Sequence, residues 1–79
     1  MSDELRNQLR EIIAEVAEID EVPDDTLFAD LGIDSMMAME IVAEVEREYK
    51  LEIPESEIAD LTNFNAVYEK VSKKLAEAS

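Results

Sequence analysis

Apolar residues recur three or four positions apart along most of the chain, the spacing of an α-helix, and do not alternate as in a surface strand. The first such stretch runs from about Asp3 to Ile19 and predicts an amphipathic helix. Its apolar stripe consists of Leu5, Leu9, Ile12, Ile13, Val16 and Ile19.

The helical periodicity fails between Asp20 and Ile33, where Pro23 and the pair Asp24-Asp25 favour turns. So long a connection in a small domain needs side chains that pack onto the helices. We expect four apolar residues to serve as these anchors, and Asp25-Thr26 to start a short helical turn. The four anchors are Leu27, Phe28, Leu31 and Ile33.

A second helix is predicted from Ser35 to about Lys50, and it carries two stripes. The core stripe consists of Ala38, Ile41, Val42, Val45 and Tyr49. A second face, about 200° around the helix, should meet solvent. It consists of Met36, Met39, Glu40, Ala43 and Arg47. Exposed Met suits adaptable partner surfaces, whereas Met packed under the loop would be ordinary core.

Pro54 ends this helix, because proline removes a backbone donor and biases the preceding residue toward extended structure. The stretch from Glu55 to Leu61 predicts at most a short helix, with Ile58 and Leu61 facing inward. The pair Thr62-Asn63 predicts a cap for the last helix. Its inward stripe is Phe64, Val67, Tyr68, Val71 and Leu75. The expected fold is all-α, in one domain spanning residues 1–79.

The formal net charge is −14, from 7 basic and 21 acidic residues. Such a surface repels nucleic acid and anionic membranes, so we expect neither as a partner and favour basic patches on proteins. There is no Cys, which excludes disulfides and thiolate chemistry. The N-terminus lacks a targeting signal and no stretch could span a membrane, which predicts a cytoplasmic protein.

The residue composition does not favour a catalytic site. A nucleophilic serine needs a base, and the chain has no His. The carboxylates are spread over helix faces, so we expect no enzyme. A calcium-binding EF-hand is also excluded, because aligning Gly32 with the loop's invariant glycine puts Leu27, Ala29 and Leu31 at liganding positions. We therefore expect no metal site.

The candidate chemistry lies where the loop meets the central helix. Gly32 permits a backbone conformation that other residues resist, and Asp34 is a good helix cap. Ser35 is thereby presented at a helix N-terminus, where the partial positive potential favours phosphate. A serine in this position is most often only a helix cap. The surrounding sequence is therefore needed to tell a cap from a site of modification.

That context resembles the acyl carrier protein family from the first helix to the last. The resemblance rests on the segment Asp30-Leu31-Gly32-Ile33-Asp34-Ser35-Met36, with Phe28, Glu40, Glu44-Val45-Glu46, Tyr49 and Ile53-Pro54. It implies a small four-helix bundle with three longer helices, a short third helix and a long first loop. A phosphopantetheinyl transferase would join 4′-phosphopantetheine from coenzyme A covalently to Ser35, and Asp34 would help position the transferase's Mg²⁺. The thiol of that arm would hold an acyl group as a thioester.

The resemblance also implies how the carrier meets other molecules. Acyl-transferring and acyl-modifying enzymes would use their own basic patches to dock onto the second helix of the carrier. The carrier would act as a monomer. The implied contact residues are Met36, Met37, Met39, Glu40, Ala43, Glu44, Arg47 and Glu48. An acyl chain would be sheltered between the second and third helices, in a cavity lined by Val42, Val45, Ile58, Ala59 and Leu61.

Two departures from the family pattern bear on the pathway. Met37 stands where fatty-acid carriers commonly have an acidic residue, which widens the apolar patch, and Arg47 interrupts an acidic helix end. We expect a free-standing carrier, since no linker flanks the helices, serving fatty-acid synthesis or a specialised lipid or polyketide-type pathway. The alternatives are an aminoacyl or peptidyl carrier and an acidic helical interaction module with an unmodified Ser35.

Overall fold

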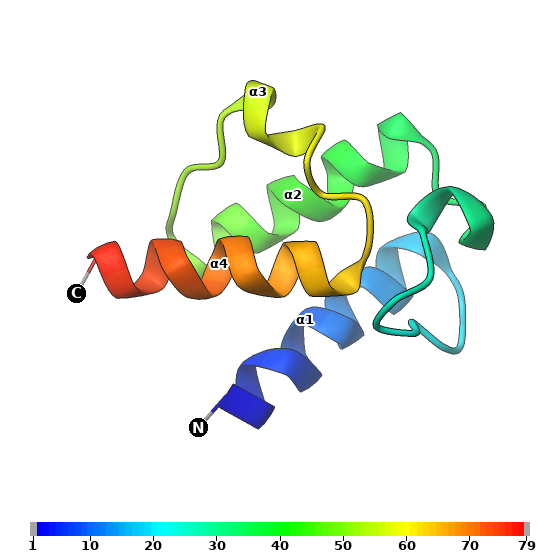
Figure 1. The fold of residues 1–79 in the computed structure, drawn as a ribbon, viewed down its shortest axis with the longest axis horizontal. Coiled ribbons are helices and arrows are strands. Elements are labelled where there is room, and N and C mark those ends of the chain that lie inside the picture. Colours follow the sequence, from blue (N-terminus) through cyan, green and yellow to red (C-terminus); the bar gives the residue numbers. More distant parts are fainter. Residues whose placement is uncertain (1, 79) are drawn as a thin grey trace.

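The structure, a computed structural model, describes residues 2–78, and every regular element in that range is helical. The elements are α1 (Ser2–Ala17), the short 3-10 helix η1 (Phe28–Leu31), α2 (Ser35–Tyr49), α3 (Glu55–Ile58) and α4 (Phe64–Ala78). Helices α1, α2 and α4 form the body, and α3 lies at its edge (Figure 1). The predicted all-α bundle, with three longer helices, a short third one and a long first loop, is confirmed.

Two of the long helices end on residues in the left-handed conformation that usually belongs to glycine. Glu18 has a φ of 56° and Lys50 a φ of 54°. In each case the next residue donates its N–H to a carbonyl five positions back, Ile19 to Ala14 (3.0 Å) and Leu51 to Glu46 (3.2 Å). This hydrogen bond ends α1 at Ala17, so Ile19 lies outside the helix that was predicted to include it.

The long loop is anchored differently from the expectation. Phe28 and Ile33 are buried as predicted, but Leu27 is 47% exposed and Val22, which was not predicted as an anchor, is 2% exposed. The helical turn falls at Phe28–Leu31 and not at Asp25-Thr26. Val22 reaches the core because the chain folds back after α1, a placement that no local pattern indicates.

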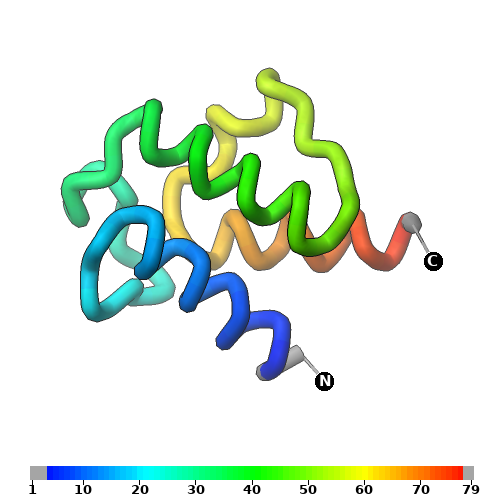
Figure 2. Tube along the Cα trace, turned by 180° about the vertical axis from the view of Figure 1, so that it is seen from behind, coloured from blue at the N-terminus to red at the C-terminus, as the bar shows by residue number. Residues whose placement is uncertain are grey.

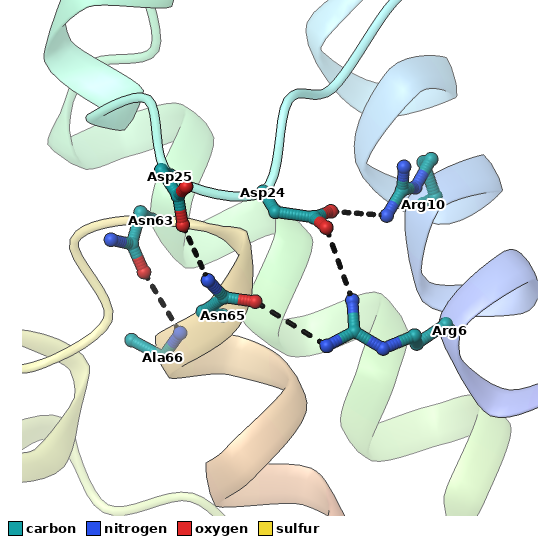
Figure 3. Close-up of polar contacts among 7 residues, drawn as sticks. All are labelled: Arg6, Arg10, Asp24, Asp25, Asn63, Asn65 and Ala66. Carbon is teal, nitrogen blue, oxygen red and sulfur yellow. Dashed lines mark hydrogen bonds and ion pairs between the residues drawn. The ribbon is translucent and has the colours of Figure 1, made fainter. Parts of the chain in front are cut away.

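A polar cluster joins this loop to α1 and to the start of α4 (Figure 3). Asp24 forms ion pairs with both Arg6, at 3.5 Å, and Arg10. The Asp24 carbonyl also accepts from the Asn65 N–H at 3.2 Å. Asn65 in turn donates to Asp25 at 2.7 Å and accepts from Arg6 at 3.5 Å. We call this set of five residues the clamp, because it joins three segments that are distant in the sequence.

The hydrophobic core lies between α1, α2 and α4. It consists of Leu9, Ile13, Ala17, Val22, Phe28, Ile33, Ile41, Val42, Val45, Ile53, Leu61, Phe64, Val67 and Val71. Asn63 caps α4 by accepting from the Ala66 N–H at 2.9 Å, as predicted. Helix α3 has no buried residue of its own and is tied to α4 where Glu57 accepts from Lys70 (3.1 Å) and Lys74 (3.3 Å). Within residues 2–78 no helix has the length and apolar character needed to cross a bilayer.

Candidate functional site

Ser35 is the first residue of α2 and is exposed. The preceding residue, Asp34, has extended backbone and accepts from the Met37 N–H through Oδ1 at 2.9 Å. Its carbonyl accepts from Ala38 at 2.9 Å, the first hydrogen bond of the helix. Asp34 therefore caps α2 as predicted and determines where the Ser35 hydroxyl stands.

Gly32 directs the chain toward this cap. Its φ is 81° and its N–H donates to Ala29 at 3.2 Å, while the Ile33 N–H donates to Phe28 at 2.9 Å. A Cβ placed on Gly32 would meet no atom within 4 Å. Glycine is favoured here by the left-handed backbone and not by lack of space.

Ser35 lies at the edge of an open, mainly apolar groove of about 230 Å³. Its lining residues are Leu27, Phe28, Ala29, Ile33, Asp34, Ser35, Ala38, Leu61 and Thr62. Thr62 reaches this site because its carbonyl accepts from the Phe28 N–H at 2.8 Å, which joins the loop before α4 to η1. Sequence reasoning assigned Thr62 only to a helix cap, and nothing in its local sequence marks it as a neighbour of Ser35.

The outer face of α2 is exposed as the second stripe predicts. Met36 is 74% exposed and Met39 is 46% exposed, beside exposed Glu40, Ala43 and Arg47. Arg47 donates to Glu44 at 2.7 Å, and Glu48, next to Arg47, is exposed. Met37 differs from the expectation. It is half-buried and packs against the core, so it adds little to the apolar patch.

The interior cavity beside α2 is nearly closed, with a volume of about 10 Å³, room for at most one water molecule. Of the residues expected to line it, Val42, Val45 and Leu61 do. Ile58 and Ala59 do not line it, and Ala59 is exposed. Helix α3 is only four residues long, and Ile58 at its end is half-buried. The cavity is bounded by α2, α4, η1 and the loops instead.

The surroundings of Ser35 fit a phosphodiester. The serine side chain is exposed, and no described group accepts the backbone N–H of Ser35 or Met36, so the positive end of a 15-residue helix remains available. Among the described residues, no group of three His, Cys, Asp or Glu side chains could hold a metal ion. The arrangement can therefore bear a covalent phosphate ester, and it offers Ser35 no histidine base.

Comparison with known proteins identifies the family. A family model described as "Phosphopantetheine attachment site" matches residues 7–71. Polyketide-8 synthase acyl carrier protein 2 of Streptomyces avermitilis is 40% identical, over 91% of this chain and 86% of that protein. The non-reducing polyketide synthase dbaI of Emericella nidulans is 35% identical over 92% of this chain, which spans only 3% of that synthase.

Solved structures support the same family assignment. An acyl carrier protein from Thermotoga maritima superposes with a TM-score of 0.86 at 28% identity, covering 99% of this chain and 94% of that one. A chain in the structure of the ishigamide ketosynthase/chain length factor gives a TM-score of 0.82 at 29% identity, covering 92% of this chain and 96% of that one. This chain belongs to the phosphopantetheine-attachment family and is an acyl carrier protein, a carrier of the phosphopantetheine type and not an enzyme.

Proposed function

We propose that Ser35 bears the 4′-phosphopantetheine arm and that the chain carries acyl intermediates of a polyketide-type pathway as thioesters. The observation that carries this proposal is the exposed Ser35 at the capped start of α2, within a chain of the phosphopantetheine-attachment family. The apolar groove beside Ser35 supports it, since it gives an arm a surface to lie against.

The loading step is a phosphoryl-group transfer from coenzyme A. The Ser35 oxygen attacks the phosphorus that bears the pantetheine, a new oxygen–phosphorus bond forms, and the phosphoanhydride bond breaks. Adenosine 3′,5′-bisphosphate leaves, and the serine proton passes to a base on the transferase. The step needs no oxidant or reductant.

The chain's own residues position the arm. Asp34 caps α2 through Oδ1, and its Oδ2 makes no bond within the described structure, so it remains available to the transferase's Mg²⁺. The unpaired N–H groups at the start of α2 stabilise the negative charge of the phosphodiester. When bound, the arm supplies a terminal thiol that forms and exchanges thioesters, a group that this cysteine-free chain lacks.

The pathway assignment is supported by the relatives. Both sequence relatives described above are named for polyketide synthesis. The exposed Arg47 on α2 also departs from an entirely acidic partner face, which favours a specialised pathway over general fatty-acid synthesis. The partners are then the transferase and acyl-handling enzymes with basic patches that meet the α2 face.

Intact-mass measurement tests the attachment residue. The chain is coexpressed with a promiscuous phosphopantetheinyl transferase, and the wild type is expected to gain the mass of one arm. Ser35→Ala should gain none. Ser56→Ala is the matched control, because Ser56 is also exposed and lies on the short helix α3. A wild type that stays unmodified by a transferase active on a known carrier, or a Ser35→Ala variant that is modified, would refute the proposal.

A second measurement tests the pathway. The holo chain, loaded with a malonyl group, is offered to a ketosynthase–chain length factor pair and to a ketosynthase of fatty-acid synthesis. We expect the higher kcat/KM for this carrier with the first enzyme. The reverse order would assign the chain to fatty-acid synthesis.

A further inference from the structure

A further groove lies between α1 and α2, and Ser35 is not among its lining residues. These helices pack against each other (Figure 2), and the groove between them measures about 490 Å³. Helix α1 contributes Ile12, Glu15 and Val16 to its lining. Helix α2 contributes Glu40, Ala43, Glu44 and Arg47.

The groove has an apolar floor and an acidic rim. Ile12 and Val16 are half-buried and pack against the core. Ala43 is exposed, and its side chain is a single methyl group that fills little of the groove. Glu15 and Glu40 are exposed, and within the described structure neither carboxylate has an ion pair or a hydrogen bond. The rim therefore presents negative charge that the chain itself does not neutralise.

Most basic residues of the chain form ion pairs outside the groove. Arg6 and Arg10 bind Asp24 in the clamp, and Lys70 and Lys74 bind Glu57 between α3 and α4. Arg47 is the one basic residue that lines the groove, and it pairs with Glu44 at 2.7 Å while its side chain stays 75% exposed. An exposed pair of this kind is weak, so a competing cation can replace it.

We propose that this groove is a docking site for a lysine or arginine side chain of a partner enzyme, and that α1 thereby takes part in partner recognition. The aliphatic stem of the partner residue lies on Ile12, Val16 and Ala43, and its cation lies between the carboxylates of Glu15 and Glu40. Arg47, which pairs with Glu44, places its own positive charge at the rim and so opposes the incoming cation. The proposal rests on the proposed function for the identity of the partner as an acyl-handling enzyme.

The chemistry of the groove favours a long cationic side chain over other occupants. Its carboxylates do not converge tightly enough for a metal ion among the described residues. A fully apolar ligand would leave the acidic rim unpaired, and an anion would be repelled by it. A lysine or arginine matches both parts, because its stem is apolar and its head is positive.

The groove is also continuous with the exposed face of α2. Glu40 and Ala43 belong to both, and Met39 lies next to Glu40 on that face. Glu40 follows Ser35 by five residues, a rise of roughly 7.5 Å along the helix. A partner held in the groove is therefore close to the point at which the arm is attached.

The first test uses n-butylguanidinium, a probe that reproduces an arginine side chain, and does not require a modified Ser35. Methyl spectra of the chain labelled at Ile, Val and Ala are recorded as the probe is added, with n-butanol and guanidinium as controls. We expect saturable shifts of the Ile12, Val16 and Ala43 methyls with the probe alone. Shifts that are no larger there than over the rest of the surface would overturn the proposal.

Matched charge variants sharpen this test. Glu15→Gln removes a groove carboxylate, whereas Glu69→Gln makes the same change at an exposed helical position outside the groove. Glu15→Gln should raise the Kd of the probe about fivefold, the equivalent of roughly 1 kcal/mol, and Glu69→Gln less than about twofold. Arg47→Gln removes the positive charge from the rim and should lower the Kd. Equal effects of the two Glu variants would refute the groove site.

The second test uses a partner. The holo forms of the wild type and variants are compared for kcat/KM with the ketosynthase–chain length factor pair. Glu15→Gln should lower kcat/KM more than Glu69→Gln does, and Ala43→Met, which fills the groove without changing charge, should also lower it. Unchanged values for Glu15→Gln and Ala43→Met would overturn partner docking there. Failure of the wild type to become holo would instead refute the proposed function, while the probe titration still decides the groove.

Discussion

The clamp around Asp24 offers a quantitative test of what holds the long loop in place. In Asp24→Asn the carboxylate that receives Arg6 and Arg10 becomes a neutral amide, while the backbone hydrogen bond from Asn65 to the Asp24 carbonyl is retained. Asp20→Asn is the matched control. It removes the same charge from the same loop, and Asp20 is exposed and makes no ion pair in the described structure.

The expected magnitude follows from exposure. The side chains of Asp24, Arg6 and Arg10 are 44%, 33% and 38% exposed, so each ion pair is partly screened by water. Pairs of this kind stabilise a fold by about 0.2–1 kcal/mol each, and two of them act on Asp24. Both variants also relieve the self-repulsion of a chain with net charge −14, and this gain cancels in the comparison. We expect Asp24→Asn to be about 1 kcal/mol less stable than Asp20→Asn.

The assay is urea unfolding at low ionic strength, followed by thermal melting. A difference of about 1 kcal/mol corresponds to roughly 4–8 °C in Tm for a domain of this size. Arg10→Met closes a double-mutant cycle with Asp24→Asn, and the coupling should recover the share of the Arg10 pair, roughly half of the difference. Arg10 also lies over the Phe64 ring at 4.4 Å, a contact that this cycle cancels. If Asp24→Asn and Asp20→Asn agree within about 0.3 kcal/mol, the clamp does not stabilise the loop.

Two further predictions concern α3 and the turn before Ser35. The hydrogen bond from Lys70 to Glu57, supported by Lys74, lowers the pKa of the Glu57 carboxyl. The ionised carboxylate therefore stabilises the fold at neutral pH. This contribution is lost as the pH falls through the lowered pKa. The stability difference between the wild type and Glu57→Gln in urea unfolding should therefore shrink on acidification. A difference that does not vary with pH would contradict the assignment, and Glu55→Gln serves as the control. Gly32→Ala should cost about 1–2 kcal/mol in thermal melts, because a Cβ disfavours its φ of 81° although space is available, and Gly32→Asn should cost less. An alanine variant as stable as the wild type would show that the turn can adopt another conformation.

The sequence by itself determined the features that depend on local pattern. Helical spacing placed both ends of α1 and α2 within two residues, and the start of α4 directly after its predicted cap, because a buried stripe recurs with the helix period. The order of Gly32, Asp34 and Ser35 predicted a left-handed turn, a cap and an exposed hydroxyl, and each involves only residues close in the chain. The exposed face of α2 was likewise predictable from the stripe that the core leaves unused.

Only the tertiary structure decided which side chains from distant segments meet. Val22 is buried and Leu27, a predicted anchor, is exposed, because the path of the loop after α1 depends on what it packs against. Thr62 reached the groove of Ser35 through a hydrogen bond to Phe28, and Asp24 met two arginines of α1. The groove between α1 and α2 takes Ile12 and Val16 from one helix and Ala43 from the other. Such contacts depend on the relative placement of helices, which a periodic pattern along one segment does not specify.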